Sequence, residues 1–159
     1  MSDERALLAK YLGMQRRHVL EQVDGLSDHA MQRAMLPSGW TPAGLVQHLA
    51  VDVERWWFRR ILRGEPLEFD GGAWTVEAGV APASVIALYK EEIERADAII
   101  AATPLDAPMA WWPEDQWPDW RLEDLRDVIL HVVAETACHA GHLDAARELM
   151  DGKQWIIAE

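Results

Sequence analysis

Apolar side chains recur every three or four positions along four long stretches of this chain, and this spacing constrains the fold more than any other feature. The stretches cover residues 4–24, 41–62, 82–100 and 121–150. Because an α-helix advances by about 100° per residue, such spacing places the apolar side chains on one face of a helix. Strand signals are nearly absent. The sequence therefore predicts an all-α fold in which four amphipathic helices form a bundle.

Residues with known preferences for helix ends flank these stretches. Thr41 can cap the second helix and Pro42 suits its first position, while Pro82 opens the third helix and Gly152 stops the fourth. No repeat, low-complexity tract or long linker divides the 159 residues. We therefore expect residues 1–159 to form a single domain.

The segment between the third and fourth helices, "PLDAPMAWWPEDQWPDW", is rich in proline and holds four of the nine tryptophans in the chain. It is too apolar to be a free linker. We expect it to fold over one end of the bundle as a lid or wall. The tryptophan content favours a cleft for a ligand, because indole rings offer broad apolar surfaces and one hydrogen-bond donor each.

Charge narrows the range of partners. The chain has 15 Lys and Arg against 27 Asp and Glu, a formal net charge of -12, which repels nucleic acid and anionic lipid surfaces. The N-terminus has no sustained apolar segment behind a basic start, and no run approaches the length of a membrane span. A single cysteine, Cys138, agrees with a reducing compartment. The sequence predicts a cytoplasmic protein without nucleic acid or membrane partners.

The fourth helix carries a stripe of possible metal ligands, because its helical spacing places His131, Glu135, His139 and His142 on one side. Two ligands at positions i and i+4, such as Glu135 and His139, can converge on one metal ion. The alternative is that these side chains are solvated or bonded to neighbours. A third ligand from another helix would favour the metal.

The best third ligand is His48, which lies one turn into the second helix at the flank of its apolar face. Its alternative role is a histidine at the edge of the core, bonded to a carbonyl. We interpret His18 and His29 as surface residues. Cys138 could pair with His142 as an activated nucleophile, but core packing is the favoured interpretation for a lone cysteine.

Four arginines, at positions 55, 59, 60 and 63, follow or flank the first tryptophan pair. They could meet an anionic substrate if one faced the cleft. A solvated face is the favoured interpretation of such a run. The charged residues Asp144, Arg147 and Glu148 are likewise expected to be ordinary helix-surface charges.

The segments "LPSGWTPAGLVQHLAVDVERWW" and "HVVAETACHAGHLDAARELMDG" resemble the DinB/YfiT-like superfamily of four-helix-bundle metalloproteins. Many of these proteins have one histidine on the second helix and an HxxxH pair on the fourth. The corresponding residues here are His48, Glu135 and His139. Glutamate at the second position is similar to the branch that contains mycothiol-dependent maleylpyruvate isomerase.

The resemblance implies a divalent metal held by His48, Glu135 and His139, most often zinc, with nickel, manganese or iron as other options. It also implies a low-molecular-weight thiol such as mycothiol and a small electrophilic substrate. His142 then becomes a catalytic candidate, either as a proton carrier or as a group that supports a ligand, and His131 could serve in the same way. The resemblance also favours a homodimer.

The expected activity is that of a thiol-dependent S-transferase or isomerase. Two alternatives stay open. A metal-bound hydroxide could hydrolyse a substrate without any thiol. The protein could also be a non-enzymatic module that binds a small ligand or acts in a stress response, because one fold supports many functions.

Overall fold

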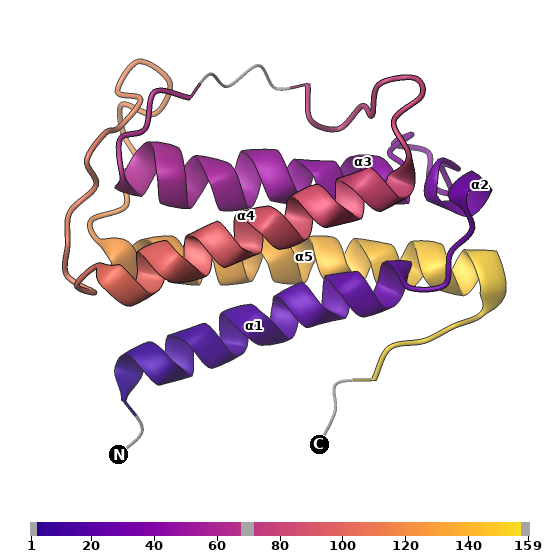
Figure 1. The fold of residues 1–159 in the computed structure, drawn as a ribbon, viewed down its shortest axis with the longest axis horizontal. Helices are drawn as coiled ribbons and strands as arrows, with labels where there is room; N and C mark the ends of the chain where they lie inside the picture. Colours follow the sequence, from indigo (N-terminus) through magenta and orange to yellow (C-terminus); the bar gives the residue numbers. More distant parts are fainter. Residues whose placement is uncertain (1–2, 68–71, 157–159) are drawn as a thin grey trace.

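The computed structural model describes residues 3–67 and 72–156 of the chain, and these residues are arranged as a bundle of helices. Figure 1 shows the long helical segments lying side by side, with long loops above one side of the bundle. The elements are α1 (Glu4–Val23), α2 (Asp28–Met31), α3 (Pro42–His48), η1 (Leu49–Leu62), α4 (Pro82–Ala102) and α5 (Leu125–Asp151). Within the described residues, the only β-type pairing is an isolated bridge between Pro108 and Asp124. The predicted all-α bundle is confirmed.

The second long segment is continuous although its hydrogen bonding changes along it. From Pro42 to His48 it is an α-helix, and from Leu49 to Leu62 it is a π-helix, in which hydrogen bonds span five residues. Thr41 caps its start, since the Thr41 hydroxyl oxygen accepts a hydrogen bond from the amide of Gly44 at 3.0 Å. The predicted start and end of this segment are confirmed.

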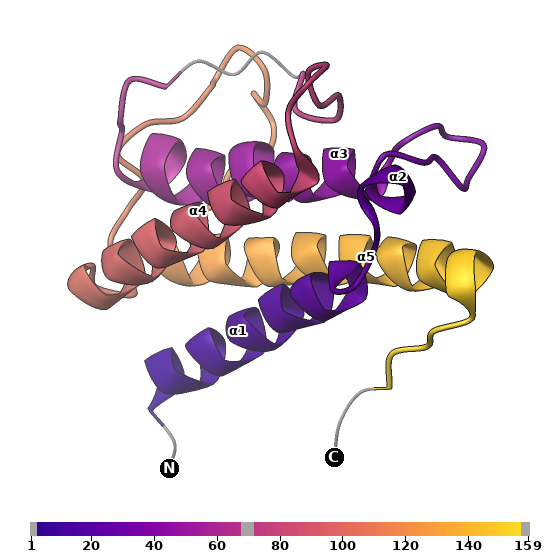
Figure 2. The same ribbon diagram turned by 45° about the vertical axis from the view of Figure 1, so that its right-hand side comes forward.

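The bundle buries one shared core. The helix α1 lies along α5, α4 lies along η1, and α5 also packs against η1 (Figures 1 and 2). Apolar side chains from all of these elements are almost completely buried. They include Leu12, Val19, Leu45, Leu49, Phe58, Tyr89, Ile129 and Val132.

The start of the last helix differs from the prediction. The sequence pattern placed it near Arg121, but α5 begins at Leu125, because the Asp124 side chain accepts a hydrogen bond from the amide of Asp127 and so caps the helix there. The bridge between Pro108 and Asp124 holds the preceding residues in the loop. The end agrees with the prediction, since Gly152 has a φ of 74°, a left-handed conformation that favours glycine.

The loop rich in tryptophan and proline is fastened to the end of η1. Its amides at Ala110 and Trp111 donate hydrogen bonds to the carbonyls of Leu62 and Ile61, at 3.2 and 3.1 Å. Gly64 permits this close approach, because a Cβ atom there would lie 3.2 Å from the Cβ of Ala110. The loop therefore forms a fixed wall at this end of the bundle, as predicted.

Ion pairs within the bundle involve residues that the sequence pattern placed on the surface. Arg55 and Arg59 both donate hydrogen bonds to Glu92, whose side chain is fully buried, at 3.0 to 3.2 Å. A solvated face was thus the wrong interpretation for these two arginines. Arg147 is also buried, and it donates to the backbone carbonyls of Gln22 and Asp24. These contacts tie α4 to η1 and α5 to α1.

Within the described part of the chain, no helix is both long enough and apolar enough to cross a membrane.

Candidate metal centre

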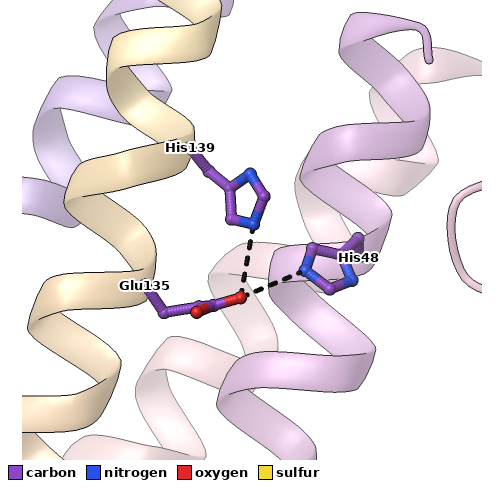
Figure 3. Close-up of side chains that lie close together, drawn as sticks. All are labelled: His48, Glu135 and His139. Carbon is purple, nitrogen blue, oxygen red and sulfur yellow. Dashed lines mark hydrogen bonds and ion pairs between the residues drawn. The ribbon is translucent and has the colours of Figure 1, made fainter. Parts of the chain in front are cut away.

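Three side chains from two helices meet at one point of the bundle. His48 comes from the end of α3, and Glu135 and His139 come from successive turns of α5 (Figure 3). The Nε2 atoms of His139 and His48 lie 3.3 and 3.8 Å from the same Glu135 oxygen, and the three possible ligand atoms all lie within 4.8 Å of one another. Ligand atoms that are each about 2 Å from an ion are at most about 4 Å apart. The group is close to the spacing that a metal ion requires.

The orientation of His48 fits a metal ligand. Its Nδ1 atom lies 2.8 Å from an oxygen of Asp52, one turn along the same helix. The Nδ1 hydrogen therefore bonds to the carboxylate, which leaves the lone pair on Nε2 directed at Glu135 and His139. This Nε2 atom is buried and has no hydrogen-bond partner among the described residues. A buried acceptor in this state is costly, and a divalent cation would satisfy it.

His139 has a comparable neighbour. Its Nδ1 atom lies 3.4 Å from Nδ1 of His142, on the side of the ring that faces away from Glu135. If His139 binds a metal through Nε2, its Nδ1 hydrogen can bond to His142. His142 itself is exposed and lies outside the three-residue group. Its position suits support of His139 better than direct contact with a ligand in the pocket.

The electrostatics of the group favour a charged carboxylate. The hydrogen bond with His139 and the nearby ring of His48, at 3.8 Å, hold the pKa of Glu135 far below its ordinary value. Burial lowers the pKa of His48, but the hydrogen bond with Asp52 and the nearby Glu135 carboxylate outweigh burial and leave the pKa raised. Burial lowers the pKa of His131, so this ring is neutral at pH 7. Without a metal, His48 therefore holds a proton more strongly than an ordinary histidine does. Glu135 presents an ionised carboxylate oxygen.

A loop residue, Trp74, covers one side of the centre. Its ring stacks on His48 with centroids 4.1 Å apart and lies 5.3 Å from the ring of His139. Gln47 fixes the loop by donating hydrogen bonds to the carbonyls of Ala73 and Thr75. The backbone there also touches Gly44, where a Cβ atom would lie 2.2 Å from the Trp74 carbonyl oxygen. Glycine at position 44 is thus required for this contact.

A pocket of about 270 Å³ opens beside His48 and Glu135. Its other walls come from η1, α5 and the loop that precedes α5. These are Asp52, Trp56, Trp57, Trp117, Trp120 and His131. The pocket joins the candidate metal centre to an aromatic surface, where a small molecule could lie next to the ion.

Several sequence interpretations are corrected by the structure. His18 is buried, stacks on Trp155 at 3.6 Å and bonds to Asp144 at 2.7 Å, so it is not a surface residue. His29 is exposed, as predicted. Cys138 is exposed, so core packing was the wrong interpretation for this residue. It projects from α5 away from the core that its neighbours Thr136 and His139 help to fill.

Two residues of the centre were missed by sequence reasoning. Asp52 follows His48 by one helical turn, and that spacing alone could have identified it as the partner of the histidine. Trp74 had no comparable local signal. It reaches His48 from a loop more than twenty residues away, and only tertiary contacts bring it there.

Fold and site together define a DinB-like helical bundle in which a His/Glu/His group could hold a metal ion. Comparison with protein families gives the narrower assignment. The family model described as mycothiol S-transferase matches residues 7–152, and the chain belongs to this family. No curated protein and no solved structure gives a match.

Proposed function

We propose that this protein is a metal-dependent S-transferase that joins a low-molecular-weight thiol of the mycothiol type to a small electrophile. The observation that carries the proposal is the unpartnered, buried Nε2 atom of His48, directed at Glu135 beside a tryptophan-lined pocket. Membership of the mycothiol S-transferase family supports the thiol as cosubstrate. We propose zinc as the ion, since two imidazoles and one carboxylate are a common catalytic zinc set; nickel, manganese and iron are the other options.

A divalent ion held by His48, Glu135 and His139 would lower the pKa of a thiol and supply its thiolate form. The sulfur then forms a bond to the electrophilic carbon. Either a leaving group departs with its electron pair, or a conjugated double bond takes up the electrons and afterwards a proton. His131 lines the pocket and is neutral, so it can accept the proton that the thiol loses.

We assign His142 a role through His139. It lies against the nitrogen of His139 that faces away from Glu135, where it can accept the Nδ1 hydrogen and hold the ring in place. A proton carrier at position 142 is the alternative. The two roles differ in their kinetics, because loss of the supporting contact lowers metal affinity, whereas loss of a proton carrier lowers turnover at saturating metal.

The test is metal analysis combined with a thiol-transfer assay. Protein stripped with chelator and reloaded with zinc should bind one equivalent and consume mycothiol in the presence of an electrophile. His48→Ala and His139→Ala should each abolish loading and transfer, while exposed His29→Ala serves as the matched control. Unchanged metal content in both ligand variants would refute the site.

Two alternatives make different predictions in the same assays. A hydrolase would turn over esters or amides at a rate that does not depend on added thiol. A non-enzymatic module would bind a small ligand tightly and leave it unconverted. Isomerisation is distinguished by thiol that is required but not consumed.

We also propose a cytoplasmic location and a homodimer. The exposed, unpaired Cys138 suits a reducing compartment. Exposed apolar side chains on the helices, such as Leu7, Tyr11 and Leu130, could form a contact between two copies. Light scattering tests the dimer, and a monomer at high concentration would refute it.

A further inference from the structure

The pocket beside the candidate metal centre has an unusual balance of aromatic and acidic groups. Four of its eight lining residues are tryptophans, and the carboxylates of Asp52 and Glu135 border it. No Arg or Lys belongs to its lining within the part of the chain that the structure describes. A site for an anionic substrate ordinarily presents an arginine or lysine to the substrate's carboxylate or phosphate.

The arginines of η1 close to this region are engaged elsewhere, and Arg121, which follows Trp120, pairs with Glu114 at 2.7 Å. Arg55 and Arg59 are bonded to buried Glu92. The guanidinium of Arg60 lies 3.7 Å from the ring centre of Trp111 and donates a hydrogen bond to the Glu65 carbonyl. Turning Arg55 or Arg59 toward the pocket would break its bonds to Glu92 and leave that buried carboxylate with fewer counter-charges, since Arg95 is its other partner. Turning Arg60 would break its contacts with Trp111 and Glu65.

Charge balance at the centre gives the same result. Asp52 and Glu135 together bring two negative charges, which one divalent cation would neutralise. No surplus positive charge is then left for a carboxylate on the substrate. The net charge of -12 for the chain adds a repulsive field at longer range.

The tryptophan rings are arranged to receive a flat, apolar group. Trp57 and Trp117 are nearly parallel, with an interplanar angle of 11°, and Trp120 stands almost perpendicular to Trp57 at 88°. Trp120 is 42% exposed although it lines the pocket, so part of its surface is free to cover a ligand. Aromatic rings pack well against such faces and edges.

We infer that this pocket selects an uncharged, planar aromatic electrophile and rejects electrophiles that carry a carboxylate. The inference names the substrate class of the S-transferase proposed above and rests on that function. Asp52, Glu135 and the tryptophans of the pocket wall provide this selectivity, and binding measurements can detect it without any turnover.

The test uses probes that cannot react with a thiol. N-phenylsuccinimide and N-(4-carboxyphenyl)succinimide lack an electrophilic double bond and differ by one carboxylate. Their affinities for the zinc-loaded protein are measured by calorimetry or by quenching of tryptophan fluorescence. We expect the neutral probe to bind at least about tenfold more tightly, because the carboxylate would lose its water at a pocket that offers no arginine or lysine in return. The inference would be overturned if the carboxylate probe bound as tightly as N-phenylsuccinimide or more tightly. It would also be overturned if an analogue with a 4-trimethylammonio group bound more tightly than N-phenylsuccinimide.

Variants of Trp120 test whether the difference in probe affinity arises at this pocket. Trp120→Leu should weaken binding of N-phenylsuccinimide about fivefold, since it removes an exposed aromatic wall without opening the core. Trp155→Leu is the matched control, because Trp155 stacks on His18 and does not line this pocket. Trp120→Lys should reduce the ratio between the affinities of the neutral probe and the carboxylate probe. An unchanged ratio in Trp120→Lys, or equal losses in the 120 and 155 variants, would refute the assignment.

Reactive probes separate this inference from the proposed function. N-phenylmaleimide and its 4-carboxy analogue accept a thiolate at the double bond, where sulfur bonds to carbon and the electrons end on the enolate before protonation. Selective binding of the neutral succinimide without transfer to the maleimide would refute the transferase and support the pocket chemistry. Transfer to both maleimides at equal rates, with equal binding, would support the transferase and refute the selectivity.

Discussion

The indole ring of Trp74 stacks on the imidazole ring of His48, with centroids 4.1 Å apart and planes inclined by 18°. The contact links a loop to a candidate metal ligand and limits how far that ligand can rotate. It depends on the close approach of the loop backbone to Gly44. The geometry of the candidate metal centre is therefore set partly by Trp74, which is not one of the three possible metal ligands.

Gly44→Ala should weaken zinc binding about tenfold, a loss typical for changes in the surroundings of a metal ligand. The added Cβ would lie 2.2 Å from the Trp74 carbonyl oxygen, so the loop must move away and uncover His48. Zinc affinity is measured by competition with a chromophoric chelator. Gly13→Ala is the control, because it lies within α1 with nothing within 4 Å of its added Cβ. Equal affinities in the two variants would contradict the prediction.

Asp52→Asn should destabilise the metal-free protein by about 1 kcal/mol near pH 6 and by less near pH 8.5. Burial lowers the pKa of His48, but Asp52 and Glu135 raise it by more, so the folded pKa lies above the ordinary value of 6.5. A raised pKa stabilises the fold fully below the unfolded value, and the contribution is lost as pH rises through the folded value.

Urea unfolding of the stripped protein at the two pH values measures this difference. Asp119→Asn, at an exposed loop position, is the control. A loss of unfolding free energy that is the same at both pH values, or larger at high pH, would show that Asp52 does not raise the pKa of His48.

Arg16→Met should cost about 3–5 kcal/mol, the range for breaking a buried ion pair. Arg16 donates two hydrogen bonds to Glu54, at 2.7 and 2.6 Å, and the Glu54 side chain is completely buried. Removing the arginine leaves that carboxylate without its cation. Replacing both residues by Met should recover much of the loss, because no buried charge is then left unpaired; Asp97, the other partner of Arg16, is exposed to solvent.

Chemical denaturation of the single and double variants measures the coupling. Arg121→Met is the matched control, since its pair with Glu114 is largely exposed and should change stability by less than about 0.5 kcal/mol. A double variant as unstable as the sum of its singles would argue against the pair.

Cys138 should react with a water-soluble disulfide reagent in the folded protein, because its side chain is exposed. Cys138→Ala should leave zinc content and thiol transfer within about twofold of the original protein, since this residue belongs to neither the ligand group nor the pocket lining. Labelling is followed by absorbance in native and denatured protein. A thiol that reacts only after denaturation would restore the core-packing interpretation, and a variant that loses transfer would restore the nucleophile interpretation.

The sequence by itself determined the helices and much of the ligand set. Helix content and most helix ends follow from local patterns, such as apolar spacing, Thr41 before Pro42, and Gly152 after α5. Glu135 and His139 share one helix at i and i+4, so their proximity is a property of the helix alone. His48 is predicted as the third ligand from its place on the second helix, and the resemblance to a known family strengthens that prediction, because Glu135 and His139 lie almost ninety residues away in the sequence.

Tertiary structure decided what these side chains contact. The rotation of the helices against one another decided the burial of His18 and the exposure of Cys138. It also brought Arg55 and Arg59 into contact with Glu92. Local spacing specifies a helix face but not the partner that covers it. Trp74 shows this most clearly, since long-range contacts at Gly44 and Gln47 alone bring it over His48.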